Sequence, residues 1–93
     1  MKNDIETAIS DAKNYVGENW NELDPKAREV IIDMAYNLGG PRLNKFKKLK
    51  EALKKQDYQT AADEMKDSKW YYDVGNRSKE LINIMKSIDN QEK

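Results

Sequence analysis

The sequence contains neither cysteine nor histidine. Without cysteine there is no disulfide, no thiol nucleophile and no thiolate ligand for a metal, so disulfide-stapled and redox classes are excluded. Without histidine, the side chain that most often serves as a general base and as a metal ligand is missing too. Any catalysis would have to use carboxylates, lysine, tyrosine or serine, and the sequence predicts no metal site and no cofactor.

Long apolar runs are also missing. The chain starts Met1-Lys2-Asn3-Asp4 without the apolar segment of a secretory signal, and no stretch is long enough for a membrane span. We therefore expect a soluble, cytoplasmic chain with no membrane partner.

Charge of one sign is not in excess, because 17 basic residues balance 17 acidic ones. No overall field therefore draws the chain to nucleic acid or to an anionic membrane. Basic residues nevertheless gather in 41–55, opposed only by Glu51; this basic patch consists of Arg42, Lys45, Lys47, Lys48, Lys50, Lys54 and Lys55. Its plain interpretation is a solvated helix face. A nucleic-acid contact helix from Lys45 to Lys55 is a weaker alternative, because the helix has acidic neighbours and Phe46 alone interleaves with its lysines.

Apolar residues recur at helical spacing almost throughout, and no stretch alternates as a half-buried strand would. The sequence predicts one all-α domain over 1–93, a compact bundle of about five helices with a tail that frays at about 89–93. Asp24 and Pro25 are typical of an N-cap and first helical position, and Gly17 and Gly39 of helix ends. The five expected apolar stripes are Ile5/Ala8/Ile9/Ala12/Val16, Ala27/Val30/Ile31/Met34/Ala35/Leu38, Leu43/Phe46/Leu49/Leu53, Ala61/Ala62/Met65 and Leu81/Ile82/Ile84/Met85/Ile88.

The stretch "SKWYYDVGNRSKELI" (68–82) gathers aromatic residues, an amide and an arginine between two of these helices. Trp70 is interpreted either as a core residue whose indole N–H meets a carbonyl or water, or as part of a sugar site. Tyr71 and Tyr72 cannot both face inward on a helix, so at least one is expected at the surface. Arg77 is interpreted either as a surface ion pair with Asp73 or Glu80, or as a ligand for sugar hydroxyls and carboxylates. Composition alone does not decide between these.

Four segments in order, "VIIDMAYNLGG" (30–40), the stripe from Phe46 to Leu53, "DYQTAADEM" (57–65) and "SKWYYDVGNRSKELI", resemble the carboxy-terminal lobe of the T-even phage lysozymes. The wider phage muramidase (endolysin) family is similar in these elements. The likeness covers roughly residues 4–88. It implies a helical lobe lacking the amino-terminal lobe that holds the family's catalytic Glu, Asp and Thr, and it implies a phage-infected host as the location, with access to the cell wall.

By the same resemblance, Asn37 corresponds to a cleft wall, and Trp70, Tyr71, Asn76 and Arg77 to the cleft floor and its surroundings, with Arg77 directed at the absent catalytic carboxylate. The sequence departs from the family at Asn37, where some relatives have Gln, and at Gly75, where the T-even enzymes have Pro. The glycine makes that corner less rigid. No catalytic residue is predicted in this chain.

Three functions remain open from the sequence. The first is a peptidoglycan-binding or structural half of a phage endolysin, not catalytic alone, that faces peptidoglycan or a catalytic lobe. The second is a repurposed lobe that binds or inhibits a partner protein through the former inter-lobe surface, which should then be an exposed apolar patch. The third is part of a complete muramidase, if a catalytic lobe precedes these residues; whether the chain is an enzyme stays undecided.

Overall fold

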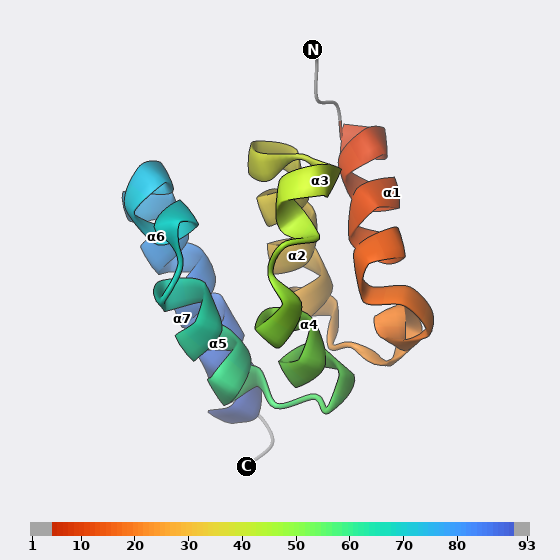
Figure 1. Cartoon of the computed structure of the whole chain (residues 1–93). Helices are drawn as coiled ribbons and strands as arrows, with labels where there is room; N and C mark the ends of the chain where they lie inside the picture. The colour runs from red at the N-terminus through yellow and green to blue at the C-terminus, as the bar shows by residue number, and fades with distance from the viewer. Residues whose placement is uncertain (1–4, 91–93) are drawn as a thin grey trace.

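The computed structural model describes residues 5–90, and within them the chain is helical and contains no strand. The helices are α1 (Ile5–Val16), the 3-10 helix η1 (Gly17–Glu22), α2 (Pro25–Leu38), α3 (Gly40–Leu43), α4 (Lys47–Lys54), α5 (Tyr58–Lys66), α6 (Lys69–Val74) and α7 (Asn76–Asn90). Figure 1 shows α1 to α4 grouped on one side of the molecule, with α5, α6 and α7 on the other. The all-α prediction is confirmed.

The ends of the central helix α2 follow from local chemistry. The Asp24 carboxylate accepts from the backbone N–H of Lys26 at 2.9 Å, and Pro25 occupies the first turn, as predicted. Gly39 then stops α2 with a φ of +84°, a conformation that L side chains rarely adopt. These two signals position the side chains of α2 that reach the candidate site.

The number of helices differs from the predicted five, because the described residues form seven α-helices and η1. The stripe from Leu43 to Leu53 is not one helix: α3 ends at Leu43, and Phe46 has a φ of −83° and a ψ of 71° as the N-cap of α4. The Tyr15 hydroxyl of α1, 31 positions earlier in the chain, donates to the Phe46 carbonyl. A long-range hydrogen bond thus fixes the break, which local spacing does not reveal.

The stripe predicted for 5–16 is also rotated. Ala8, Ala12, Tyr15 and Val16 are buried, whereas Ile5 is exposed and Ile9 only half-buried. The small alanines let α1 lie close to α2, its main neighbour, so the larger isoleucines remain at the edge of that contact. Part of the expected core of this helix is therefore surface.

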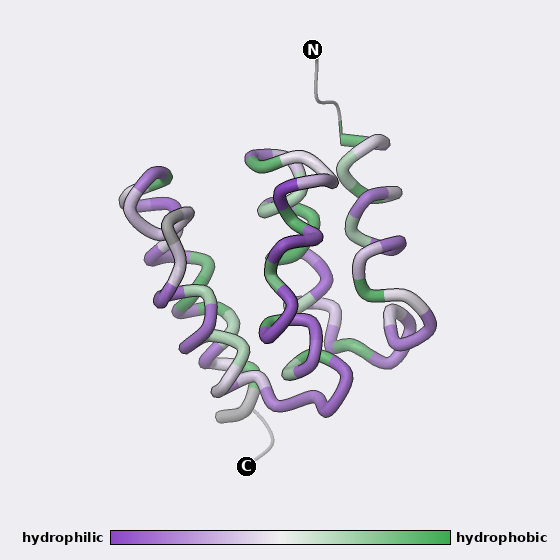
Figure 2. The backbone as a smooth tube through the Cα atoms, in the orientation of Figure 1, coloured by the Kyte–Doolittle hydropathy of each residue, from purple (hydrophilic) through white to green (hydrophobic). Residues whose placement is uncertain are grey.

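One core joins all the helices of the described part. α7 packs against α5 and α2, α1 packs against α2, and α4 packs against α5. Figure 2 shows that hydrophobic and hydrophilic residues alternate along each helix, and the buried members Leu49, Ala52 and Leu53 of α4 belong to this core. The Cα radius of gyration of 12.0 Å equals the roughly 12 Å expected for a compact domain of this length. α7 is helical through Asn90, and the remainder of the tail expected to fray, 91–93, lies outside the described residues.

Candidate functional site

Two of the predicted site residues, Asn37 and Arg77, meet at the same carboxylate. The Arg77 guanidinium in the first turn of α7 donates to Asp33 Oδ2 on α2, and Asn37 Nδ2 donates to Asp33 Oδ1 at 3.4 Å. Arg77 Nη1 also donates to Glu80 Oε1 at 3.0 Å. We call Asp33, Asn37, Arg77 and Glu80 the polar cluster; it brings α2 and α7 together at the surface.

The hydrogen bonds of the polar cluster favour the charged form of Arg77 further. Its hydrogen bond with Asp33, followed by that with Glu80, raises the pKa of the guanidinium above its ordinary value. The partners are partly or largely solvent-exposed, so these ion pairs contribute little to folding stability. The cluster is therefore a surface where an incoming anion or hydroxyl would compete with Asp33 and Glu80 for the same donors.

The partner of Arg77 was only half predicted. The expected pair with Glu80 is confirmed, but Asp73 lies instead 3.9 Å from Arg42, measured from Oδ2 to Nη2. Asp33 was missed, although its separation of four residues from Asn37 puts both on one helix face. The contact between Asp33 and Arg77 spans 44 positions, so no local signal could reveal it.

Trp70 is a core residue in this structure. Its side chain is 2 % exposed, and its indole Nε1 is buried without a hydrogen-bond partner among the described residues. The core interpretation of Trp70 is thus confirmed, and of the two partners expected for its N–H, a carbonyl or water, no carbonyl among the described residues accepts from it. Trp70 lines a groove together with Leu38 and Phe46, described below.

The two tyrosines that follow divide as predicted. Tyr71 is half-buried and packs against the core, whereas Tyr72 is 78 % exposed. Their rings contact edge to face, with centroids 5.1 Å apart and an interplanar angle of 85°. The ring that is free to lie against a flat ligand here is therefore that of Tyr72, which was not among the predicted site residues.

The corner before Arg77 is braced rather than loose. Gly75 has a φ of +74°, and Asn76 follows it as the exposed first residue of α7. The buried Ser78 hydroxyl lies 2.8 Å from the Tyr71 carbonyl and 2.5 Å from that of Gly75. Sequence reasoning missed Ser78, because a serine near a helix start gives no sign of being buried.

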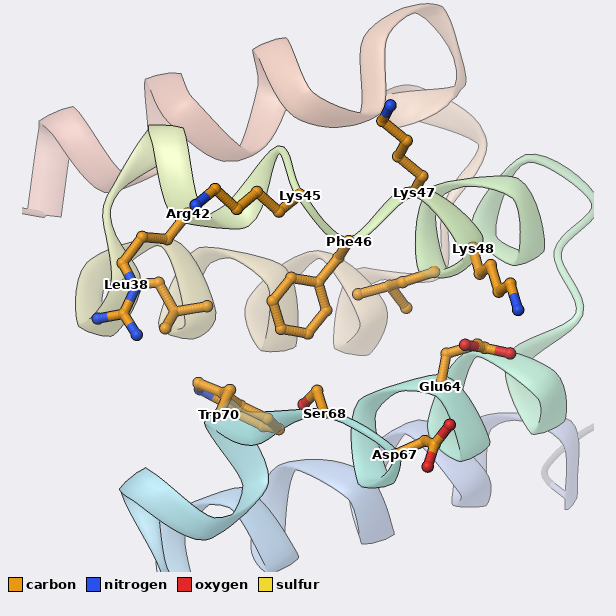
Figure 3. Close-up of a pocket in the computed structure, with 11 residues that line it drawn as sticks. Leu38, Arg42, Lys45, Phe46, Lys47, Lys48, Glu64, Asp67, Ser68 and Trp70 are labelled. Atoms are coloured by element: carbon orange, nitrogen blue, oxygen red, sulfur yellow. The ribbon is translucent and has the colours of Figure 1, made fainter.

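The basic patch does not form a single helix face. Arg42 lies in α3, Lys45 lies between helices, and α4 begins only at Lys47. Lys50 is half-buried and the other members are exposed. Beside the patch runs a groove of about 550 Å³, which Figure 3 shows between the α3–α4 segment and the α5–α6 segment.

A second hollow of about 370 Å³ is largely apolar and adjoins the polar cluster. Ile5, Ile9, Ile32 and Tyr36 line it together with Glu29 and Asp33, the carboxylate that Arg77 contacts. Ile5 is 57 % exposed and Tyr36 45 % exposed. We call this the α1–α2 hollow; an exposed apolar patch is what the second of the three functions predicts.

Neither a metal centre nor a membrane-spanning helix is found in the part of the chain that the structure describes. Within residues 5–90 no group of three or more metal-ligating side chains converges. No helix in that range has the length and apolar character needed to cross a bilayer.

One comparison with known proteins identifies a relative. The chain is 25% identical over 89 residues to a protein of Dictyostelium discoideum named "Probable T4-type lysozyme 2", and the match covers 94% of this chain and 52% of the relative. The chain thus spans about half the length of the curated relative that it matches. No protein-family model and no solved structure matches the chain. The distant homology supports a lysozyme-like domain.

Proposed function

We propose that this chain is the peptidoglycan-binding half of a phage-type lysozyme architecture and that it does not cleave the glycan by itself. The likeness to a T4-type lysozyme carries this proposal, because it extends over nearly the whole chain but only about half of the relative. The all-α bundle with an exposed polar cluster is compatible with it. Amide and guanidinium groups such as those of Asn37 and Arg77 suit the hydroxyls and carboxylates of a bacterial glycan.

The chemistry of the polar cluster favours binding over cleavage. Glycoside hydrolysis needs two carboxyl groups on opposite sides of the scissile bond, and one of them must donate a proton to the leaving oxygen. Asp33 and Glu80 both accept hydrogen bonds from Arg77, so they are engaged as acceptors rather than as donors. Catalysis would then come from a separate lobe, either in a longer protein or as a partner.

Retention on purified peptidoglycan tests the proposal. Arg77→Gln removes the guanidinium, and we expect binding to weaken about tenfold, the value of one charge-assisted hydrogen bond. Lys79→Gln is the matched control, because it removes one positive charge from an exposed position on the same helix. Equal retention of wild type and Arg77→Gln, or an equal loss in both variants, would contradict a specific role for the polar cluster.

The non-catalytic part is tested separately by release of reducing ends from cell walls. We expect none from the purified chain. Release of reducing ends that is abolished by Asp33→Asn or Glu80→Gln would overturn this part and leave the binding assay unaffected.

A second function is favoured by the α1–α2 hollow. A contiguous patch of large exposed apolar side chains is typical of a contact site for another protein. A partner protein or a catalytic lobe seated there would cover Ile5 and Tyr36 and would approach Asp33 of the polar cluster. Cross-linking through a photoreactive group at position 36 in expressing cells tests this function, and the absence of any cross-linked protein would reject it.

A further inference from the structure

The groove beside the basic patch is separate from the polar cluster. It has a volume of about 550 Å³, within the range of small-molecule sites, and includes none of Asp33, Asn37, Arg77 or Glu80 in its lining. Its floor is apolar, formed by Leu38, Phe46, Leu49 and Trp70. Phe46, which lies between α3 and α4 and whose carbonyl accepts from the Tyr15 hydroxyl, is part of this lining.

Charge is distributed unevenly along this groove. Figure 3 shows Lys48 facing Glu64 at one end, with Asp67 on the same side, and the Arg42 guanidinium at the other end beside Leu38. The groove lining contains Lys45, which has no ion pair among the described residues, and Arg42, whose partner carboxylate on Asp73 is 3.9 Å away.

An unsatisfied donor lies at the Leu38 end. Trp70 Nε1 is buried and unpartnered, and Figure 3 draws the indole nitrogen on the side of Leu38 and Arg42. A buried N–H without an acceptor is costly, so native structures rarely keep one. The Arg42 side chain at this end is 60 % exposed and has only the 3.9 Å contact with Asp73, so its guanidinium can turn towards a bound anion.

We propose that this groove binds an alkyl carboxylate. The carboxylate lies between Arg42 and Lys45 and accepts from Trp70 Nε1, and the alkyl chain lies over Phe46 towards Leu49. Two cations and an N–H donor select a negative acceptor over a neutral or positive head group. The apolar floor selects a hydrocarbon body over a sugar, so this ligand differs from the glycan proposed for the polar cluster.

Titration with decanoate, followed by the indole N–H resonances in 1H–15N NMR spectra, tests the proposal. Trp20→Phe leaves Trp70 as the one remaining indole. We expect a saturable downfield shift of the Trp70 indole proton with decanoate, and at least about tenfold weaker binding of decanol, which lacks the charge. Decylammonium should not bind.

Two double variants test where the carboxylate of decanoate binds. The double variant Arg42→Gln, Lys45→Gln should weaken decanoate binding by about tenfold or more. The control is Lys54→Gln, Lys55→Gln, which removes two charges of the basic patch that lie outside the groove. Decanoate binding should be unchanged in this control. All four positions are exposed, so these variants keep the fold. No shift of the Trp70 indole with decanoate, equal binding of decanol, or equal weakening by both double variants would overturn the proposal.

Discussion

At the residue scale, Ser78 decides how the chain turns into its last helix. It is fully buried, and its hydroxyl reaches the carbonyls of Tyr71 and Gly75. These contacts connect the end of α6 to the start of α7. Because Arg77 is the residue before Ser78, they also help to orient the Arg77 side chain. We therefore expect the polar cluster to depend on Ser78, although this buried residue is not one of its members.

Ser78→Ala tests this dependence. We expect a loss of about 1–2 kcal/mol in the free energy of unfolding, because buried hydrogen bonds are lost without a substitute. Ser87→Ala is the matched control: Ser87 donates to the Ile84 carbonyl at 2.7 Å from a half-buried position of the same helix and should cost less. Urea denaturation gives both values, and equal losses would contradict the bracing role.

Trp70 combines a large buried volume with an unpaired donor, and two substitutions separate these effects. Trp70→Ala should cost about 3–5 kcal/mol, because it leaves a large cavity in the core. Trp70→Phe keeps most of the volume and removes the unpaired N–H, whose burial costs about 1–3 kcal/mol, so it should cost less than half as much. Urea unfolding measures both, and equal losses would mean that Nε1 has a partner in solution.

At the element scale, α5 carries a cap that responds to pH. The Asp57 carboxylate accepts from the Thr60 hydroxyl at 2.7 Å and from the Thr60 N–H at 3.3 Å. These hydrogen bonds, the side-chain one first, lower the pKa of Asp57 from its ordinary 3.8. A lowered pKa in the folded state means that the carboxylate stabilises the fold above pH 3.8 and that this contribution is lost as the pH falls through the folded-state value.

Asp57→Asn isolates that contribution, because asparagine still caps a helix but does not titrate. The stability advantage of the wild type over this variant should be present at neutral pH and should shrink as the pH falls below 3.8. Urea midpoints of both proteins across the acid range measure it. A difference that stays constant with pH would show that the charge of Asp57 plays no part.

The same scale shows what the sequence could and could not predict. α2 and α7 were predicted well, because caps and apolar spacing act within a few residues. Two features could not be settled from local sequence. The break between α3 and α4 depends on a hydrogen bond from Tyr15, and the burial of Trp70 depends on the packing of the whole bundle. The candidate site divides in the same way: Asn37 and Arg77 were identified, but Asp33, which joins them, is revealed only by folding.

At the scale of the whole molecule, three separate surfaces are each proposed to bind a different kind of ligand. The polar cluster suits a glycan, the groove suits an alkyl carboxylate, and the α1–α2 hollow suits a protein. The first and third share Asp33, so a protein seated on the hollow would lie beside any glycan held by Arg77. That adjacency fits an architecture in which one lobe binds the substrate and another acts on it.

The last prediction concerns the apolar surface of the α1–α2 hollow. Ile5→Glu, Tyr36→Glu places two charges in an apolar surface, and because both side chains are exposed the free energy of unfolding should change by no more than about 0.5 kcal/mol. Binding of a fluorescent hydrophobic dye should fall strongly, since the contiguous apolar area is broken up. Tyr72→Glu is the control, because it charges an exposed aromatic outside the hollow and should leave dye binding unchanged. Equal dye binding by the wild type, the double variant and Tyr72→Glu would contradict the prediction. It would show that Ile5 and Tyr36 pack against each other in solution and leave no apolar surface for a second lobe.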